Sequence, residues 1–273
     1  MNLKKSLFLL PNIITMASIF CGFDAIRLAS DAQGDDDFWK AALLLIFAML
    51  FDTLDGRVAR ATKTQSAFGL QIDSLADVIS FGLAPAILVY KWSLFQLGAV
   101  GIFFSFAFAA CGAIRLARFN VLSMREKGAP SKPGKYILGL PIPGAAGILI
   151  SLVVANHAAA GDLHSRRYAY VLLGVVIALS GFMVSTIKFR SFKDVRLNAR
   201  TVAFLAFVIG SSAAVSAYFR PAFVLVWLLG CYIMMGVVET LLGMPRAIAQ
   251  RREARDARRA TPAEARIPTR PPV

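Results

Sequence analysis

Long apolar runs constrain the fold of this chain more than any other feature of its sequence. A helix that crosses the hydrocarbon core of a membrane needs about 20 predominantly apolar residues. The chain supplies such runs repeatedly, and we expect eight membrane spans. They cover residues 7 to 29, 38 to 60, 68 to 90, 94 to 117, 140 to 160, 168 to 187, 201 to 218 and 221 to 243. The sequence therefore predicts an all-α, polytopic membrane helix bundle with little room for a soluble domain.

The net charge of +14 would suit a nucleic-acid partner, but the positions of the basic residues indicate a membrane protein instead. They fall mostly in alternate loops and in the tail: Lys4, Lys5, Arg57, Arg60, Lys63, the loops 115 to 135 and 188 to 200, and the segment after Pro245. Cytoplasmic loops carry an excess of Lys and Arg, so we expect both termini in the cytoplasm. If the source is bacterial, the membrane is the inner, cytoplasmic one. The tail is expected to rest near anionic lipid headgroups, with no nucleic acid involved.

Four acids inside apolar segments are the strongest indication of function. Asp52, Asp55, Asp73 and Asp77 together would cost about 10 to 14 kcal/mol if they faced lipid, at about 2.5 to 3.5 kcal/mol each. Separations of three and four residues place each pair on one helix face. The connection at residues 61 to 65 is short, so the two helices are expected to be antiparallel neighbours whose pairs meet near the cytoplasmic end.

Four carboxylates so close together would repel one another unless cations lay between them. Hard oxygen ligands beside a phosphate group favour Mg²⁺ or Mn²⁺, and four shared carboxylates suit two ions. Gly56, Ala59 and Gly69 leave room for a bulky ligand near the acids. Arg60 adds a forked donor that suits pyrophosphate oxygens.

The whole pattern, Asp52-x2-Asp55-Gly56-x2-Ala59-Arg60-x8-Gly69-x3-Asp73-x3-Asp77, resembles the signature of the CDP-alcohol phosphotransferase family. The resemblance implies a six-helix core around a polar cavity that faces the cytosol, with divalent metals held by the acids. It also implies a CDP-linked donor bordered by Gly56, Ala59, Arg60 and Gly69. The last acid, Asp77, would act as the general base. An unactivated alcohol needs such a base, while metals neutralise the pyrophosphate and the leaving CMP.

Three further segments resemble the phosphatidylserine synthase branch of that family: residues 10 to 23, residues 115 to 120 with 139 to 147, and residues 183 to 193. One departure is Ser18, where many relatives carry Asn. The resemblance implies transfer of a phosphatidyl group from CDP-diacylglycerol to L-serine, giving phosphatidylserine and CMP. Arg115, Arg118 and Lys135 are candidate partners for the serine carboxylate. An equally good alternative is that these residues only contribute to the charge asymmetry of the loops or bind lipid phosphates.

The expected domain organisation follows from the extent of this similarity. Residues 1 to 200 form the catalytic core, residues 201 to 244 add two transmembrane helices, and residues 245 to 273 form a basic, disordered cytoplasmic tail. The two added helices carry almost no interior charge, and they can also provide the surface of a homodimer.

Two alternatives remain open from the sequence. The first keeps the chemistry but uses glycerol 3-phosphate or another alcohol as the acceptor, which would favour additional phosphate-binding cations in the cavity. The second is a cation transporter that uses intramembrane acids for transport. A transporter predicts acids distributed along a path across the membrane, whereas these acids cluster near one end.

Overall fold

The computed structural model describes residues 3–64, 66–126, 136–161 and 166–190, with residues 211, 227, 228, 230, 231 and 234. Lys135 and the basic tail lie outside the described residues, as do nearly all of the predicted spans 201 to 218 and 221 to 243.

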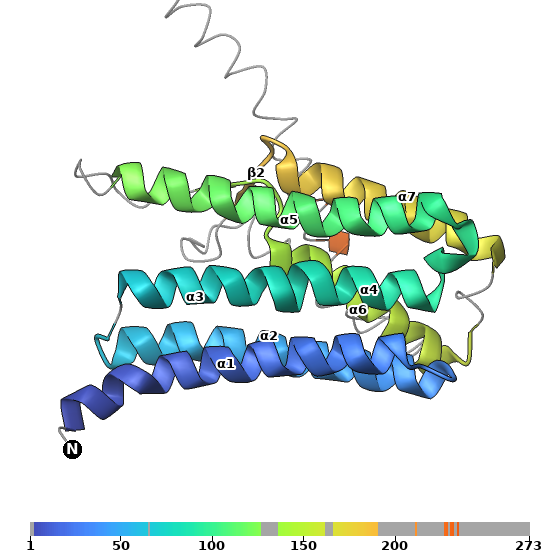
Figure 1. Cartoon of the computed structure of the whole chain (residues 1–273). Coiled ribbons are helices and arrows are strands. Elements are labelled where there is room, and N and C mark those ends of the chain that lie inside the picture. The colour runs from blue at the N-terminus through green and yellow to red at the C-terminus, as the bar shows by residue number, and fades with distance from the viewer. Residues whose placement is uncertain are drawn as a thin grey trace, which may run out of the picture.

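Six helical columns make up the described fold (Figure 1), and they bear out the prediction of an all-α membrane bundle. The columns are α1 (Leu3–Ser30), α2 (Asp35–Ala61), α3 (Ala67–Asp77) continued through a π-helical segment η1 (Val78–Leu83) into α4 (Ala84–Trp92), α5 (Ala99–Glu126), α6 (Ile142–Ala159) and α7 (Arg166–Val184). The described part also contains a two-stranded antiparallel ladder that the sequence did not predict. It pairs β1 (Tyr136–Leu138) with β2 (Lys188–Arg190).

Five helical segments in the described part are long and apolar enough to cross a membrane: 10–30, 67–92, 99–122, 142–159 and 166–184. Many large apolar side chains on these helices are exposed, among them Phe20, Phe103 and Phe106. This outward apolar surface fits lipid, and the chain is an integral membrane protein. The total of eight spans stays a prediction. The last two predicted spans lie almost wholly outside the described residues, and the predicted second span, 38 to 60 on α2, is not among the five.

The fourth predicted span begins later than expected. Residues 94 to 97 form a short 3₁₀-helix, and Gly98 has a φ of 59°. This backbone conformation favours glycine and interrupts the helical path, so α5 begins at Ala99 instead of near residue 94.

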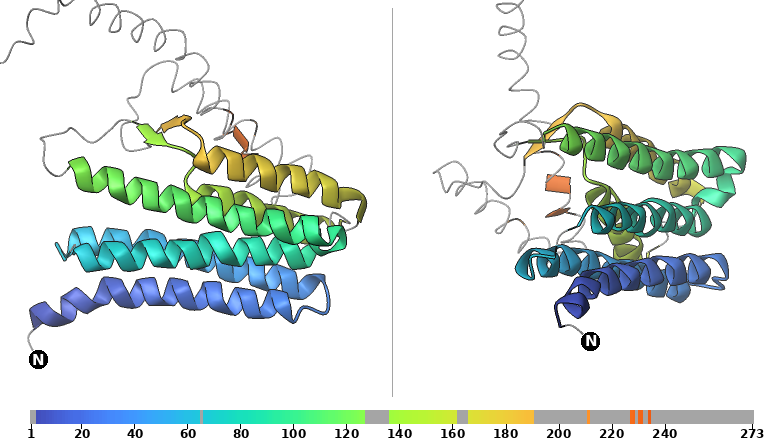
Figure 2. Two further views of the ribbon diagram at one scale, coloured as in Figure 1. Left: turned by 45° about the horizontal axis from the view of Figure 1, so that its top comes forward. Right: turned by 60° about the vertical axis from the view of Figure 1, so that its left-hand side comes forward.

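Helix α1 packs along α2 and also touches the column formed by α3, η1 and α4. Figures 1 and 2 show α1 and α2 side by side at one face of the bundle, and α5 and α7 together at the opposite face. The Ser18 hydroxyl donates to the Ala48 carbonyl of α2 at 3.1 Å, and the Ser80 hydroxyl of η1 donates to the Ser18 carbonyl at 3.0 Å. Small residues and hydroxyl groups between helices allow such close packing in membranes.

Gly22 is required at the contact between α1 and η1. A Cβ at this position would lie 2.9 Å from the Ser80 Cα, which is backbone that cannot easily move away. The two hydrogen bonds and this close contact together fix α1 relative to both helical columns that carry the acids.

Candidate active site

The connection between α2 and α3 brings the acid-bearing segments together. Helix α2 ends at Ala61, and Lys63 adopts a left-handed conformation with φ of 56° as the chain turns. Helix α3 then begins with Ser66 as its N-cap, whose hydroxyl accepts a hydrogen bond from the Gly69 backbone N–H at 2.9 Å. Such a cap satisfies one of the unpaired N–H groups of the first turn. The turn makes α2 and α3 neighbours with opposite directions.

Three of the four predicted acids meet in one cluster. One carboxylate oxygen from each of Asp52, Asp55 and Asp73 lies within 4.8 Å of the others. Asp55 is buried, and the other two are partly buried. Asp77 lies beside this group, where its carboxyl interacts with that of Asp52. One of its oxygens, Oδ1, is buried without a hydrogen-bond partner in the described structure.

Asp77 also occupies a distinctive backbone position, since it is the last residue of α3 and directly precedes the π-helical segment η1. Single π-helical turns within α-helices occur frequently at functional sites, because they alter the register of the side chains that follow. Here the altered register begins immediately after the last acid of the motif.

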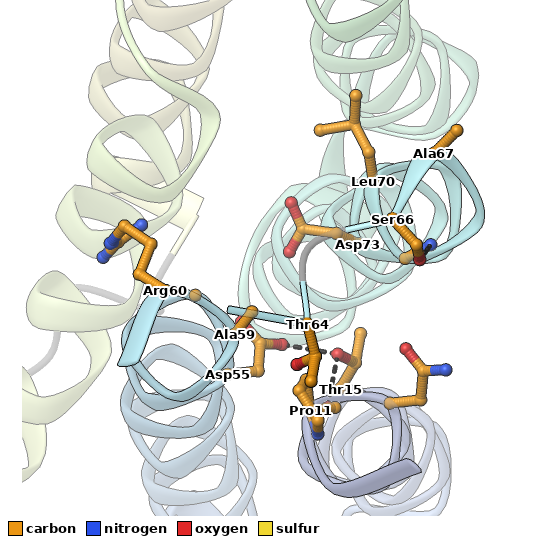
Figure 3. Close-up of a pocket in the computed structure, with 13 residues that line it drawn as sticks. Pro11, Thr15, Asp55, Ala59, Arg60, Thr64, Ser66, Ala67, Leu70 and Asp73 are labelled. Atoms are coloured by element: carbon orange, nitrogen blue, oxygen red, sulfur yellow. Dashed lines mark hydrogen bonds between the residues drawn. The ribbon is translucent and has the colours of Figure 1, made fainter. Parts of the chain in front are cut away.

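A cavity of about 530 Å³ opens beside the acid cluster (Figure 3). This volume lies within the range of about 300 to 1,000 Å³ that is usual for ligand sites. All four residues predicted to border a nucleotide line it. Its lining comprises Pro11, Asn12, Thr15, Asp55, Gly56, Ala59, Arg60, Thr64, Ser66, Ala67, Gly69, Leu70 and Asp73. In Figure 3, Asp55 and Asp73 come from different helices and flank the same space.

The two glycines of the motif both lie next to polar side chains at the cavity wall. A Cβ on Gly56 would approach the Arg60 guanidinium at 3.4 Å, so the arginine lies across the face of Gly56. A Cβ on Gly69 would lie 3.1 Å from the Ser66 hydroxyl and 3.7 Å from the Asn12 amide oxygen. The contact at Gly69 is tighter than ordinary packing, whereas the contact at Gly56 is an ordinary van der Waals contact with a flexible side chain.

Helix α1 contributes part of this site, which the sequence alone did not predict. Pro11, Asn12 and Thr15 line the cavity. The Thr15 hydroxyl lies 2.6 Å from Asp55 Oδ2. A Pro-Asn pair followed by a hydroxyl residue within an otherwise apolar run was the available signal for these residues.

The structure separates the three candidates for acceptor binding. Arg115 is buried, and its positive charge acts on Asp77. Arg118, three residues further along α5, is half-buried and donates from Nη1 to the Val184 carbonyl at 3.3 Å. Lys135 lies outside the described residues. Of the three candidates, Arg115 is therefore the one whose charge acts on a motif acid in the described structure.

The donor set of the cluster fits a metal ion. Three carboxylate oxygens within 4.8 Å of one another can be drawn onto a common cation, and hard oxygen ligands suit divalent ions. The partnerless Oδ1 of Asp77 adds a fourth acidic oxygen next to the same group.

The comparison with protein families is decisive for classification. Residues 8–186 match the family model described as CDP-alcohol phosphatidyltransferase. The chain belongs to this family. The matched range contains every acid of the cluster and every described residue that lines the cavity, and it confirms the resemblance inferred from the motif.

Several curated proteins are similar to this chain over half of its length or more. A CDP-diacylglycerol–serine O-phosphatidyltransferase of Helicobacter pylori (strain J99) is 36% identical over 245 residues, covering 89% of this chain and 95% of that protein. The archaetidylserine synthase of Methanothermobacter thermautotrophicus is 36% identical over 193 residues, covering 69% of this chain and 73% of that protein. A Mycobacterium tuberculosis (strain H37Rv) protein with the same name as the first is 39% identical over 150 residues, covering 54% of this chain and 50% of that protein.

Proposed function

We propose that this protein transfers a phosphatidyl group from CDP-diacylglycerol to L-serine and releases CMP. The observation that carries the proposal is the convergence of the motif acids on a cavity lined by Gly56, Ala59, Arg60 and Gly69, in a member of the CDP-alcohol phosphatidyltransferase family. The choice of serine is supported by the name of the Helicobacter relative, which aligns with 89% of this chain.

In this proposal, Asp52, Asp55, Asp73 and Asp77 would hold two Mg²⁺ or Mn²⁺ ions. Three of these carboxylates already share one small volume, and the fourth lies beside Asp52. Ions held there would supply positive charge to neutralise the pyrophosphate and the leaving CMP. The acids on α2 and α3 lie together next to the cavity, so the compensating charge is supplied at the place where the pyrophosphate binds.

The cavity receives the CDP headgroup of the lipid donor. Gly56, Ala59 and Gly69 leave space for the nucleotide, and Arg60 directs a planar, permanently charged donor group to phosphate oxygens. The acyl chains of the donor remain among membrane lipids, against the exposed apolar faces of the bundle.

Asp77 serves as the general base. Its carboxylate takes the proton of the acceptor hydroxyl while that oxygen forms a bond to the phosphatidyl phosphorus. The bond between this phosphorus and the bridging oxygen breaks, and CMP leaves with the electron pair. A positioned base of this kind contributes about 10² to 10⁴ in rate.

The serine carboxylate is recognised from α5. Arg115 is the principal candidate, because it is buried and its charge acts on Asp77. Arg118 and Lys135 are secondary candidates for attracting the acceptor to the same end of the bundle. The active site faces the cytoplasm, as the distribution of basic residues indicates. Residues 1 to 200 act as the catalytic core, with residues 201 to 244 and the tail outside it; the core contains the matched range 8–186.

The test uses purified protein in detergent with CDP-diacylglycerol and either Mn²⁺ or Mg²⁺. CMP release is compared with L-serine, glycerol 3-phosphate and myo-inositol phosphate as acceptors. Asp77→Asn removes the base, and Asp37→Asn serves as a matched carboxylate control at the opposite end of α2. We expect serine-dependent release that Asp77→Asn lowers by about 10² to 10⁴ and Asp37→Asn leaves unchanged.

Two results would overturn parts of the proposal. Release with glycerol 3-phosphate alone would retain the donor and metal site but replace the acceptor. If no alcohol supports metal-dependent release, transferase activity is rejected, and cation flux through reconstituted protein becomes the next measurement.

A further inference from the structure

The Thr15 side chain makes the shortest side-chain contact to the acid cluster from outside α2 and α3 among the hydrogen bonds of the described residues. It is buried on α1, and its hydroxyl lies 2.6 Å from Asp55 Oδ2. A hydroxyl that donates to an ionised carboxylate typically lies 2.5 to 2.7 Å away, so this distance is that of a charge-assisted hydrogen bond.

The same hydroxyl has a second acceptor within reach, the Pro11 carbonyl at 3.0 Å (Figure 3). A threonine carries a single O–H donor, so the proton can serve only one of the two oxygens at a time. The Pro11 carbonyl also lies four residues before Thr15 in a helix, where the backbone N–H of Thr15 is its regular partner. The carboxylate is therefore the acceptor that most needs the hydroxyl proton.

The position of Thr15 is fixed independently of this contact. One turn further along α1, Ser18 binds the Ala48 carbonyl of α2 and accepts at its own carbonyl from Ser80 of η1. These two bonds anchor α1 to both acid-bearing columns. The hydroxyl of Thr15 is thus held at a set height relative to Asp55 on α2.

We propose that Thr15 is a positioning residue for ion binding, which fixes the Asp55 carboxylate through Oδ2 so that its remaining lone pairs face the other acids. This inference rests on the proposed role of the acid cluster in holding divalent ions. Carboxylates that bind metals are commonly hydrogen-bonded from behind, and loss of such a partner typically weakens metal affinity or activity by about 10- to 100-fold. Thr15 lies outside the signature motif and contributes from a different helix.

The test measures Mn²⁺ binding directly, from the free-Mn²⁺ signal in electron paramagnetic resonance, with purified protein in detergent. Thr15→Val replaces the hydroxyl by a methyl group of similar size. We expect it to weaken Mn²⁺ binding by about 10- to 100-fold, and we expect Thr15→Ser to restore most of the affinity. The Mn²⁺ concentration that half-saturates CMP release should shift by a similar factor, with partial recovery of the rate at saturating Mn²⁺.

Ser180→Ala is the matched control. It removes another buried hydroxyl, on α7, whose hydrogen bond goes to the Val176 main-chain carbonyl and touches no acid. We expect an unchanged Mn²⁺ midpoint, whatever the change in melting temperature. A merely structural role for Thr15 would give the same result in Thr15→Val, and that outcome would overturn the inference.

Failure of the inference can be told apart from failure of the proposed function. If wild-type protein binds Mn²⁺ and Asp55→Asn abolishes binding, an unshifted midpoint in folded Thr15→Val rejects only the role of Thr15. If wild-type protein binds no Mn²⁺ and releases no CMP, the ion-binding role of the acid cluster is rejected, and the inference falls with it.

Discussion

Both ends of α2 carry acids, but the charges that surround these acids are opposite in sign at the two ends. At its first turn, Asp35, Asp36 and Asp37 lie at a helix N-terminus, where the helix dipole favours negative charge. Asp37 pairs with Lys40 at 3.0 Å, and Asp36 lies 3.7 Å from His157, which stacks on Trp39. At the far end, Asp52 and Asp55 lie away from that terminus and face another carboxylate, Asp73.

This difference distinguishes acids whose charge is compensated by neighbouring groups of the fold from acids that repel one another within a partly buried cluster. Like charges packed together within a partly buried site destabilise a protein unless cations or protons compensate them. Such local instability persists in proteins mainly where function requires it. The comparison predicts that neutralising an acid will have opposite effects on stability at the two ends of α2.

We call the end of α2 that carries Asp52 and Asp55 the inner end, and the end that carries Asp35, Asp36 and Asp37 the outer end. The largest effect is expected at the inner end. Asp73→Asn should lower CMP release by more than about 100-fold, because loss of even a supporting partner of a metal ligand costs about 10- to 100-fold. In the presence of a chelator, the same substitution should raise the melting temperature, since it removes one of three mutually repelling charges. Activity assays and thermal unfolding with EDTA check both parts. A melting temperature that falls in EDTA would contradict the interpretation of Asp73 as an uncompensated charge.

A smaller but selective effect is expected at α5. Arg115→Lys should raise the KM for L-serine by about 10- to 100-fold with a lesser change in kcat, because a hydrogen bond to a charged group contributes about 1.5 to 3 kcal/mol. Lysine retains the positive charge beside Asp77 but loses the forked geometry. Arg118→Lys is the control: it affects a half-buried side chain that binds the Val184 carbonyl, and it should change KM less than threefold. Equal effects of the two substitutions would remove the distinction between them.

The next effect concerns the packing that holds the inner end together. Gly22→Ala should destabilise the protein by about 1 to 3 kcal/mol, because its Cβ would press α1 against the Ser80 backbone of η1. Gly174→Ala on α7 is the matched control, since a Cβ there meets nothing within 4 Å. Denaturation curves measure both variants. If Gly22→Ala is as stable as Gly174→Ala, then the close contact between α1 and η1 is not required.

The sequence predicted the inner end well, because charge and helical periodicity suffice to locate it. Acids three and four residues apart must share a helix face, and a short connection must make the two helices neighbours. The contribution of α1 could not be found in this way. Thr15 is an uncharged residue in an apolar run, and its contact with Asp55 depends on the packing of residues 40 positions apart.

Two further features also escaped prediction for physical reasons. Arg115 and Arg118 differ by less than one helical turn, so hydropathy alone cannot decide which one is buried beside Asp77. The ladder between β1 and β2 joins two segments of three residues each from distant parts of the chain. Strands this short carry too little periodicity to be recognised without their partners.

The smallest effect is expected at the outer end, where Asp37→Asn should leave CMP release unchanged and lower the melting temperature only slightly. The backbone N–H of Gln33 and the Lys40 ammonium hold the pKa of Asp37 below its ordinary value of 3.8. A carboxyl with a lowered pKa stabilises the fold above its ordinary pKa, and this stabilisation is lost as the pH falls through the lowered value. The melting difference between wild type and Asp37→Asn should therefore be present at neutral pH and vanish in strong acid. If the variant is instead more stable at neutral pH, the acids at the two ends of α2 behave alike, and the contrast between compensated and uncompensated carboxylates fails.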